Sequence, residues 1–279
     1  MADHTIGMTD EEFDRIYRFL KSRYGIDMNH KKEIVTGRMN NYLRANNWNS
    51  YGAFMDAMAK DQSGVLEKKL VNMLTTNHTF FMRESEHFDF MKETVLPWIK
   101  AKEAKTKDVR IWCGASSSGE EPYALEMLLA EFFGLDYAKW NTQLLATDIS
   151  ENVLRQAIAG VYSSEQVEVL PDAWRRRFFK KMPGGENYKV TDDLKKQLIF
   201  RKFNLMDPFP FRRKMHVIFL RNVMIYFDDP TKAELVRKVY DTLEPGGYLF
   251  IGRTETLDRG STPLTIVKPS IYRKQEGVR

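Results

Sequence analysis

The sequence contains a single cysteine, Cys113, among its 279 residues. One cysteine cannot form an intramolecular disulfide, which excludes a disulfide-stapled scaffold and favours a reducing compartment. Cys113 lies in a short apolar run, so we expect a buried structural thiol rather than a reactive one. The five histidines and this cysteine lack the spacing of metal ligands, and we predict no metal site.

Long hydrophobic stretches are absent as well. No apolar run approaches the ~20 residues that a transmembrane helix requires. The segment Met1–Asp14 is polar and acidic and lacks the apolar core of a secretory signal. We therefore expect a cytoplasmic protein. With 43% hydrophobic and 29% charged residues, the composition is that of a globular chain with a sizeable core, in one large or two modest domains.

The net charge of +5 is too small to indicate a nucleic-acid partner by itself. Its distribution is uneven, because eight lysine or arginine residues and only two acids lie between Arg15 and Arg44. Two interpretations remain open for this stretch. It could form a basic face that meets an acidic partner surface, or an ordinary solvated helix face.

The first ~75 residues carry helical signals. Thr9 is placed to cap a helix with an apolar face at Ile16, Tyr17, Phe19 and Leu20. Further helical patterns cover 34–43, 51–58 and 65–74, and no strand pattern competes with them. We predict a small helical domain.

From about Val109 the pattern changes to alternating strands and helices. The predicted strands are 109–113, 143–147, 198–203, 217–220 and 248–251, and the predicted helices are 119–133, 150–159 and 230–243. This alternation indicates an α/β fold with a doubly wound, mostly parallel sheet. Pro245–Gly247 is expected to form a turn, and 160–197 interrupts the alternation as an insertion with a turn and short strands.

Small residues follow the first predicted strand, at Gly114–Gly119. Ligands of doubly wound sheets bind at such turns, outside the carboxyl ends of the strands. The Gly-Lys-Ser/Thr phosphate loop and the Gly-x-Gly-x-x-Gly fingerprint are both absent. Glu120 and Glu121 at the helix start would repel a pyrophosphate and suit a ligand with a positive centre. An ordinary tight turn is the alternative.

Two further strand ends carry polar residues. Asp148 ends the second strand, where a carboxylate can accept hydrogen bonds from ribose hydroxyls. It could instead cap the helix that follows, since Ser150 comes two residues later. Arg221-Asn222 interrupts a very apolar stretch after the fourth strand, and we interpret this polar pair as part of a site rather than of the core.

Four segments resemble one known family: Asn77–Glu84, Ala115–Tyr123, Ala146–Ile149 and Arg221–Phe227. The runs Ser-Gly-Glu-Glu-Pro-Tyr and Arg-Asn-Val-Met-Ile-Tyr-Phe are too specific to occur together by chance. On these motifs the chain resembles the chemotaxis receptor glutamate methyltransferases (CheR-type), which depend on S-adenosylmethionine. The resemblance covers nearly the whole chain.

The resemblance implies a set of cofactor-binding residues: Asn77, Thr79, Arg83, Glu120, Asp148, Asn204, Leu205, Asn222 and Val223. In the family, Asp148 matches the ribose-binding acid. Asn204-Leu205 matches the pair on the adenine side, and Asn222-Val223 matches the pair near the reacting end.

Arg83 and Tyr226 are the candidate catalytic residues. Arg83 would orient the cofactor or the substrate carboxylate, while Tyr226 would either line the methyl pocket or pack in the core. Glu121 is an alternative to Glu120 as the acidic cofactor contact. The linker here reads Thr-Phe-Phe-Met-Arg at 79–83, where a familiar member of the family has Thr-Ala-Phe-Phe-Arg, and Thr79 and Arg83 keep their spacing.

The resemblance also implies the activity and the partners. The chain would transfer a methyl group from S-adenosylmethionine to glutamate side chains of chemoreceptors, leaving S-adenosylhomocysteine and glutamyl methyl esters. Residues 1–75 would recognise the cytoplasmic helical region of the receptor, 76–95 would link it to the cofactor site, and 96–279 would form a Rossmann-like methyltransferase domain. A small antiparallel β-subdomain at about 160–197 could dock a receptor C-terminal tether. No nucleic-acid partner is expected, and the membrane is reached only through the receptor.

The mechanism would need no general base. A glutamate carboxylate has a pKa of about 4.3 and is already ionised near pH 7, which fits the absence of an evident Ser-His-Asp or Cys-His set. Two other functions share these residues. One is a methyltransferase acting on a small molecule or nucleic acid, and the other is a cofactor-binding regulator without turnover.

Overall fold

The computed structural model describes residues 6–258, 260 and 262–277. Contacts divide the chain into two compact units. One comprises the residues up to Thr76 together with Tyr226–Thr231, and the other comprises Asn77–Ile225 together with the chain from Lys232. The domain boundaries predicted at residues 75 and 95 stay predictions. Among the described residues, no helix is both long and apolar enough to cross a bilayer.

The described part of the N-terminal unit holds four helices: α1 (Asp10–Tyr24), α2 (Lys32–Ala45), α3 (Tyr51–Lys60) and α4 (Val65–Leu74). The start of α1 follows from a capping box, in which Thr9 accepts the N–H of Glu12 and Glu12 accepts the N–H of Thr9. Gly25 ends α1 with φ at 70°, as left-handed C-caps do. Side chains from all four helices are buried, among them Ile16, Met39, Phe54 and Leu70.

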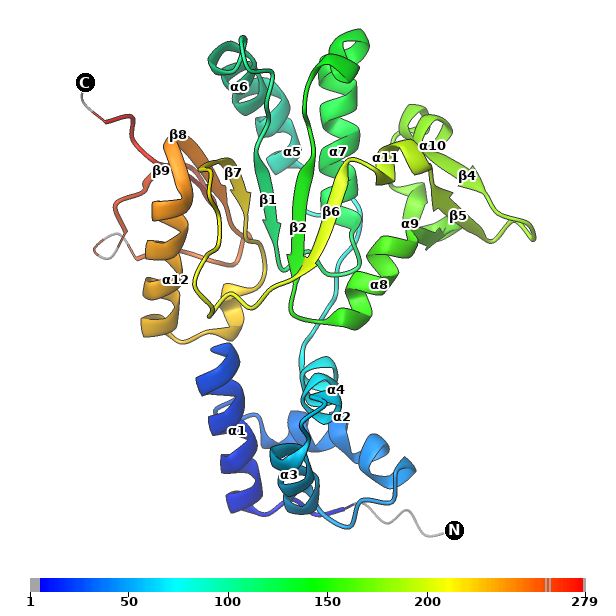
Figure 1. The fold of residues 1–279 in the computed structure, drawn as a ribbon, viewed down its shortest axis with the longest axis vertical. Helices are drawn as coiled ribbons and strands as arrows, with labels where there is room; N and C mark the ends of the chain where they lie inside the picture. Colours follow the sequence, from blue (N-terminus) through cyan, green and yellow to red (C-terminus); the bar gives the residue numbers. More distant parts are fainter. Residues whose placement is uncertain (1–5, 259, 261, 278–279) are drawn as a thin grey trace. The chain divides into compact units, whose positions relative to one another are not determined.

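The described residues of the second unit form a seven-stranded sheet with the order β6-β2-β1-β7-β8-β10-β9. The strands are β1 (Ile111–Gly114), β2 (Leu144–Asp148), β6 (Leu198–Lys202), β7 (Met215–Phe219), β8 (Leu243–Phe250), β9 (Thr265–Lys268) and β10 (Ile271–Arg273). The first five pair in parallel, and β10 pairs antiparallel with both β8 and β9. Figure 1 shows β6, β2 and β1 side by side, pointing the same way. The predicted doubly wound, mostly parallel sheet is confirmed.

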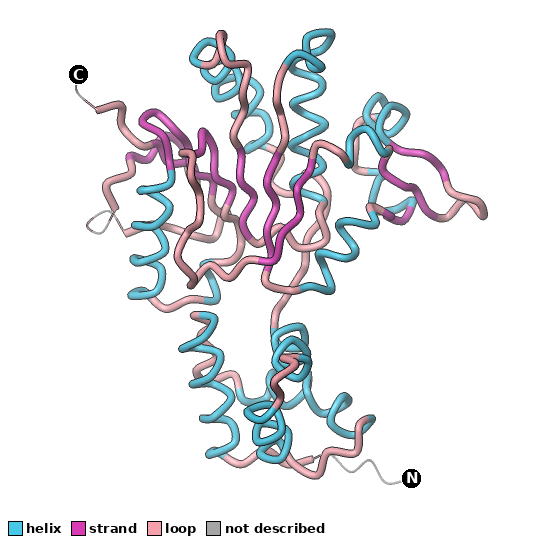
Figure 2. The backbone as a smooth tube through the Cα atoms, viewed as in Figure 1, coloured by secondary structure: helices cyan, strands magenta, loops and turns pink. Residues whose placement is uncertain are grey.

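Helices flank this sheet (Figure 2). They are α5 (Glu86–Phe90), the π-helical turn η1 (Met91–Val95), α6 (Leu96–Lys102), α7 (Glu120–Phe133), the 3₁₀ turn η2 (Gly134–Lys139), α8 (Glu151–Ala159), the 3₁₀ turn η3 (Met224–Tyr226) and α12 (Asp229–Thr242). Alternate residues of β1 face opposite sides. Ile111 and Cys113 join the buried cluster that includes α5 to α7, whereas the Trp112 ring centroid lies 5.1 Å from that of Phe209 and 4.7 Å from that of Phe211. The thiol of Cys113 is free and buried, as expected, and burial raises its pKa.

The predicted insertion folds into a small antiparallel sheet with the order β3-β5-β4. Its elements are β3 (Val161–Ser163), α9 (Ser164–Glu168), α10 (Asp172–Phe178), β4 (Phe179–Lys181), β5 (Asn187–Val190) and α11 (Asp192–Lys195). The β-subdomain is therefore confirmed. The insertion also contains helices, which were not predicted, and Arg175–Arg177 lie in one of them, α10.

The turn predicted at Pro245–Gly247 is wrong. These residues lie inside β8, which runs from Leu243 to Phe250. The register against β7 shifts between Met215 and Val217, and Gly246 takes φ of 84°. The glycines therefore accommodate a bulge in a continuing strand, a second common use of glycine in a sheet.

Candidate functional site

The loop after β1 has an unusual backbone. Ala115, Ser117 and Gly119 have φ of 57°, 49° and 98°, in the left-handed region that most residues avoid. Only glycine fits at 119, because a Cβ there would lie 2.9 Å from the Cβ of Ala157 and 3.0 Å from the hydroxyl of Tyr162. The loop therefore places backbone and small side chains at the carboxyl end of β1, where ligands of such sheets bind.

Asp148 holds this loop from the end of β2. Its Oδ2 accepts the N–H of Ser117 at 2.9 Å, and its Oδ1 accepts the N–H of Ser150 at 2.9 Å. Burial raises the pKa of Asp148, against the backbone N–H groups that favour the charged form. The cap of α8 is Ser150, whose hydroxyl accepts the N–H of Val153 at 3.5 Å. Asp148 is thus not the N-cap of this helix, and its role as a ribose ligand stays a prediction.

Glu120 and Glu121 have different partners. Glu120 accepts the hydroxyl of Ser118 at 2.8 Å and the amide of Gln166 at 3.4 Å. Glu121 accepts the guanidinium of Arg221 at 2.7 Å. Burial raises the pKa of both carboxyls. Because Glu121 already has a cation of the chain, Glu120 is the better placed of the two for a positive ligand group.

Arg221 is buried rather than open to a ligand. Its guanidinium lies 3.2 Å from Glu84, pairs with Glu121 and donates to the carbonyl oxygen of Arg83. Burial alone would raise the pKa of Glu84, but Arg221 holds it below the usual value. Arg221 and Asn222, the polar pair after β7, therefore have different roles. Arg221 ties the 77–84 segment to α7, and Asn222 is half-buried, with its side-chain amide donating to Glu84 at 3.3 Å.

The segment Asn77–Glu84 contacts the loop after β1 and the β-subdomain. The carbonyl oxygen of Asn77 accepts the hydroxyl of Ser117 at 2.9 Å. Phe81 is buried against Tyr162 of the β-subdomain, with ring centroids 4.9 Å apart. Arg83 donates to the carbonyl oxygen of His78 at 3.0 Å.

The remaining predicted site residues lie at neighbouring strand ends. Asn204 and Leu205 follow β6 and are buried, and Phe203 donates its N–H to the carbonyl oxygen of Asp148 at 3.0 Å. Val223, which follows Asn222, and Thr79, in the 77–84 segment, are half-buried. Tyr226 belongs to the N-terminal unit, where its carbonyl oxygen accepts the N–H of Asp27 at 2.7 Å. The contacts of Arg83 and Tyr226 do not test the catalytic roles predicted for them, which stay predictions.

Three site-supporting residues escaped the sequence analysis. Glu84 is the last residue of the Asn77–Glu84 motif, and the sequence predicted no role for it. Lys238 on α12 donates to the carbonyl oxygens of Leu205, Met206 and Asp207 at 2.6, 3.1 and 3.3 Å. Glu255 accepts backbone N–H groups from the loop after β7. An isolated lysine in an amphipathic helix and an isolated glutamate carry no motif, so only the fold shows what they contact.

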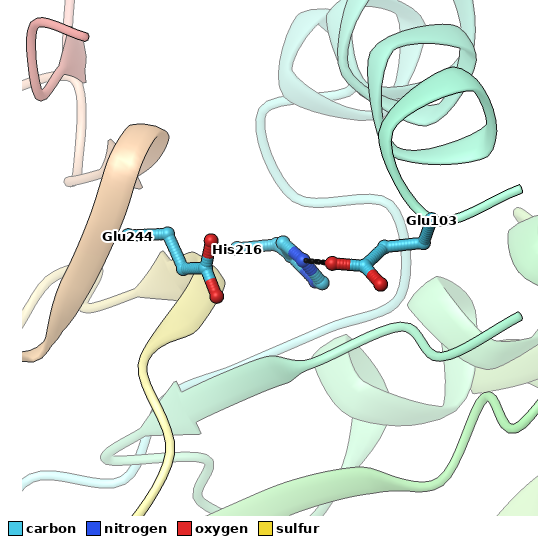
Figure 3. Close-up of side chains that lie close together, drawn as sticks. All are labelled: Glu103, His216 and Glu244. Atoms are coloured by element: carbon cyan, nitrogen blue, oxygen red, sulfur yellow. Dashed lines mark hydrogen bonds and ion pairs between the residues drawn. The ribbon is translucent and has the colours of Figure 1, made fainter. Parts of the chain in front are cut away.

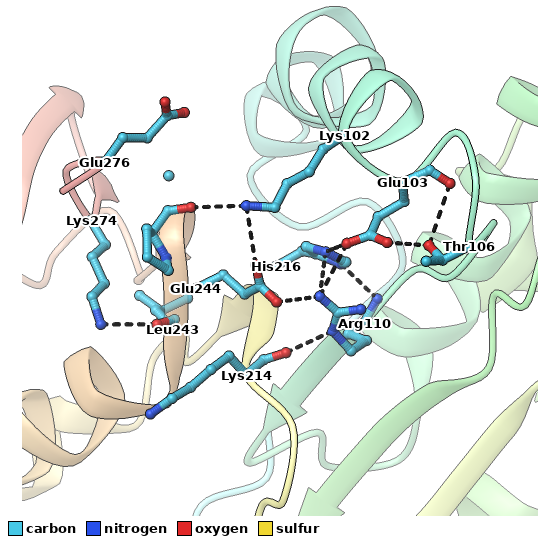
Figure 4. Close-up of polar contacts among 12 residues, drawn as sticks. Lys102, Glu103, Thr106, Arg110, Lys214, His216, Leu243, Glu244, Lys274 and Glu276 are labelled. Carbon is cyan, nitrogen blue, oxygen red and sulfur yellow. Dashed lines mark hydrogen bonds and ion pairs between the residues drawn. The ribbon is translucent and has the colours of Figure 1, made fainter. Parts of the chain in front are cut away.

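A second polar cluster lies at the opposite, amino ends of the strands. Glu103, His216 and Glu244 have ligand atoms within 4.8 Å of one another (Figure 3). Arg110 lies among them, with its guanidinium 2.7 Å from His216 Nε2, 3.3 Å from Glu103 and paired with Glu244 (Figure 4). It also reaches Asp108 at 2.7 Å. Since Arg110 and Lys102 already pair with these carboxylates, the cluster is a structural ion-pair network. The prediction of no metal site stays a prediction.

The basic stretch of the N-terminal unit is largely paired. Five of its eight cations contact acids of the same unit: Arg15–Asp56 at 2.7 Å, Arg18–Asp14 at 2.8 Å, Lys21–Asp228 at 2.5 Å, Arg23–Glu67 at 3.6 Å and Lys32–Asp10 at 2.6 Å. Exposed pairs of this kind contribute about 0–1 kcal/mol and exchange readily. The surface is therefore one of mixed charge, and its charge alone identifies no partner.

Comparison with known proteins gives two matches that together span most of the chain. Residues 77–272 match the family described as CheR methyltransferase, SAM binding domain, and residues 11–75 match CheR methyltransferase, all-alpha domain. The chain is 34% identical over 273 residues to a chemotaxis protein methyltransferase of Borreliella burgdorferi, covering 96% of each chain. It is 30% identical over 275 residues to the chemotaxis protein methyltransferase of Escherichia coli, covering 96% of this chain and 92% of that one.

Proposed function

The chain belongs to the CheR methyltransferase family, and we propose that it transfers the methyl group of S-adenosylmethionine to glutamate side chains of chemoreceptors. The products are glutamyl methyl esters and S-adenosylhomocysteine. The observation that carries the proposal is the junction of Ser117 and Asp148 at the carboxyl ends of β1 and β2. In a doubly wound sheet this is where a nucleoside is expected to bind.

The residues at this junction fit the proposed cofactor. S-adenosylmethionine combines a ribose with a positively charged sulfonium and an amino group. Asp148 offers a buried carboxylate for the ribose hydroxyls, and Glu120 offers a second one whose described partners are uncharged. The left-handed residues Ala115 and Ser117 bring backbone rather than bulky side chains to the ligand. A pyrophosphate would be repelled by the same two acids.

The roles of the other residues follow the family match. We assign the adenine side to Asn204 and Leu205, and the reacting end to Asn222 and Val223. Asn77, Thr79 and Arg83 are assigned to the segment that covers the cofactor. The contact between Asn77 and Ser117 supports this assignment, because it fastens the segment to the ribose-side loop.

The proposed methyl transfer requires no general acid or general base from the chain. When bound, the cofactor supplies a methyl group already activated by the sulfonium. The receptor carboxylate is ionised near pH 7 and attacks without a general base. The chain's part is to align the reactants and exclude water, which can lower a barrier by on the order of 7–11 kcal/mol at best. We assign the orientation of the carboxylate to Arg83 and the wall of the methyl pocket to Tyr226.

Two surfaces are proposed for the receptor. The N-terminal helical unit recognises the cytoplasmic helical region of the receptor, where its exchangeable surface ion pairs can yield to receptor acids. The β-subdomain docks the receptor's C-terminal tether, and the exposed Arg176 of α10 supports an acidic segment there. On this proposal the enzyme works in the cytoplasm, reaches the membrane only through the receptor and has no nucleic-acid partner.

The test is methyl transfer itself. Purified protein is incubated with methyl-labelled S-adenosylmethionine and membranes that contain chemoreceptors, and the label is followed into base-labile esters. Methanol released by alkali from receptor protein, with labelled glutamates found by peptide mapping, is the expected result. Membranes without receptors serve as the control. Absence of transfer by a protein that binds the cofactor, as measured by calorimetry, contradicts the receptor assignment.

A further inference from the structure

One buried carboxylate holds the loop after β7 by its backbone. Glu255 Oε2 accepts the N–H of Asn222 at 2.8 Å and the N–H of Gly252 at 2.6 Å, and Oε1 accepts the N–H of Ile225 at 3.2 Å. Glu255 is 6% exposed. Its own N–H donates to the carbonyl oxygen of Gly252 at 2.9 Å, which closes a tight turn after β8. The carboxylate thus joins the loops that follow two neighbouring parallel strands.

These hydrogen bonds matter because the loop after β7 has an unfavourable backbone conformation at its centre. Asn222 has φ of 56°, a left-handed conformation that most residues avoid and that asparagine tolerates better than most. Its side-chain amide donates to Glu84 at 3.3 Å. Asn222 is therefore fixed by two acids, Glu255 at its backbone and Glu84 at its side chain. Neither acid lies near it in the sequence.

Space around Asn222 is equally restricted. A Cβ at Gly252 would lie 2.3 Å from the side-chain nitrogen of Asn222 and 2.9 Å from the Glu255 carboxylate. Gly252 has no left-handed φ, so the backbone alone would accept alanine. The glycine is needed because Asn222 and Glu255 occupy the space, and that makes this position a second probe of the contact between them.

We propose that Glu255 is a positioning residue for cofactor binding, acting through the backbone of Asn222. It holds the loop in the one shape that presents Asn222 and Val223 to S-adenosylmethionine. The inference rests on the proposed function, since it takes the assignment of these two residues to the reacting end as given. Hydrogen bonds to an ionised group are about twice as strong as neutral ones, so a carboxylate that meets three N–H groups is a stiff support.

The first variant is Glu255→Gln, which keeps the shape and removes the charge. A glutamine must turn its NH₂ group toward one set of backbone N–H donors, so part of the grip is lost. We expect S-adenosylhomocysteine to bind about 10-fold more weakly by calorimetry. The KM for S-adenosylmethionine should rise similarly, while kcat at saturating cofactor stays within about threefold. A merely structural role would lower the melting temperature without this split.

The matched control is Glu86→Gln. Glu86 is exposed and pairs with Arg253 of the same turn at 3.1 Å, but none of its described contacts reaches the backbone of the loop. Its S-adenosylhomocysteine affinity should equal that of the wild type. If Glu255→Gln does not fold, Gly252→Ala is the second variant. Its added methyl would clash with both the Asn222 amide and the Glu255 carboxylate, so it disturbs the same contact, and it too should weaken S-adenosylhomocysteine binding.

A double-mutant cycle identifies the route. In an Asn222→Ala background, Glu255→Gln should change the affinity by less than about twofold, because the residue through which it acts is gone. If folded Glu255→Gln and folded Gly252→Ala bind S-adenosylhomocysteine as tightly as the wild type does, the positioning role of Glu255 is overturned. The cofactor assignment would still stand. A folded wild type that binds no S-adenosylhomocysteine would overturn the cofactor assignment, and the inference with it.

Discussion

The backbone N–H of Ser117 donates to the carboxylate of Asp148 at 2.9 Å. The two residues are 31 positions apart: Asp148 ends β2, and Ser117 lies in the loop after the neighbouring parallel strand β1. The hydrogen bond fixes the loop after β1 in its left-handed conformation, with Ser117 at φ of 49°. Asp148 therefore both shapes the loop and offers the carboxylate proposed to bind the ribose, and one substitution tests both roles.

Replacing Asp148 with asparagine should nearly abolish cofactor binding. The amide nitrogen would face a backbone N–H of either Ser117 or Ser150, and the charge that accepts ribose hydroxyls would be lost. Losing two charge-assisted hydrogen bonds of about 1.5–3 kcal/mol each weakens binding by on the order of 100-fold or more. Calorimetry with S-adenosylhomocysteine measures the effect. Asp193→Asn, at an exposed position of α11, is the control, and unchanged affinity of Asp148→Asn would refute the ribose assignment.

Glu120 and Glu121 should separate into a binding role and a stability role. Glu121→Gln leaves the buried Arg221 with less countercharge, so the free energy of unfolding should fall by about 1–3 kcal/mol. Glu120→Gln should leave stability nearly unchanged and weaken cofactor binding. Urea unfolding and calorimetry on both variants give the answer. The opposite pattern, with binding lost only in Glu121→Gln, would show that the acids have been assigned the wrong way round.

Lys238 should support the adenine side of the site. Its ammonium group is the shared donor for three successive carbonyl oxygens of 205–207. Lys238→Met keeps the aliphatic stem and removes the donor, which should destabilise the loop by about 1–2 kcal/mol and weaken S-adenosylhomocysteine binding by about 5- to 10-fold. Arg237→Met is the control, because Arg237 is exposed and contacts only Asp241, at 3.5 Å, among its described partners. Equal affinities of the two variants would contradict the role of Lys238.

The sequence predicts the strands and the strand-end residues well, for a physical reason. Apolar runs such as 217–220 have to be buried, and in a parallel sheet their carboxyl ends fall on one edge. Asp148 and Asn222 could therefore be placed without coordinates. The fate of Arg221 could not, because its partners Glu121 and Glu84 are 100 and 137 positions away. Only the folded chain shows that this arginine is buried by them.

The turn at Pro245–Gly247 failed for a related reason. Proline and two glycines usually interrupt a strand, but β8 is held on one side by β7 and on the other by β10. Tertiary pairing outweighed the local preference, and Gly246 absorbed the irregularity as a bulge. The helix at Arg175–Arg177 was missed similarly, since Pro171 and Asp172 mark its start only once its burial of Trp174 and Phe178 is known.

Glu126 on α7 predicts a pH dependence of stability. Its side chain is buried and accepts the hydroxyls of Thr142, at 2.7 Å, and Tyr137, at 2.5 Å, and its Oε2 has no hydrogen-bond partner among the residues that the structure describes. Burial raises its pKa from the ordinary 4.5 to about 8. Between these two values the folded protein holds a proton that the unfolded chain releases. Stability is therefore greatest below about pH 4.5 as far as this group is concerned, and it falls as pH rises toward 8.

The slope of that fall is at most about 1.4 kcal/mol per pH unit for one proton. Glu126→Gln keeps the shape, accepts the same two hydroxyls and cannot ionise, so it should remove this part of the slope between pH 5.5 and 8. Urea unfolding at several pH values measures the difference from wild type, and Glu234→Gln, at an exposed position of α12, should keep the wild-type slope. Identical slopes for Glu126→Gln and wild type would mean that Glu126 has the same pKa in the folded and unfolded chains. That result would contradict a pKa raised by burial, with no cation among the hydrogen-bond partners of this carboxyl group.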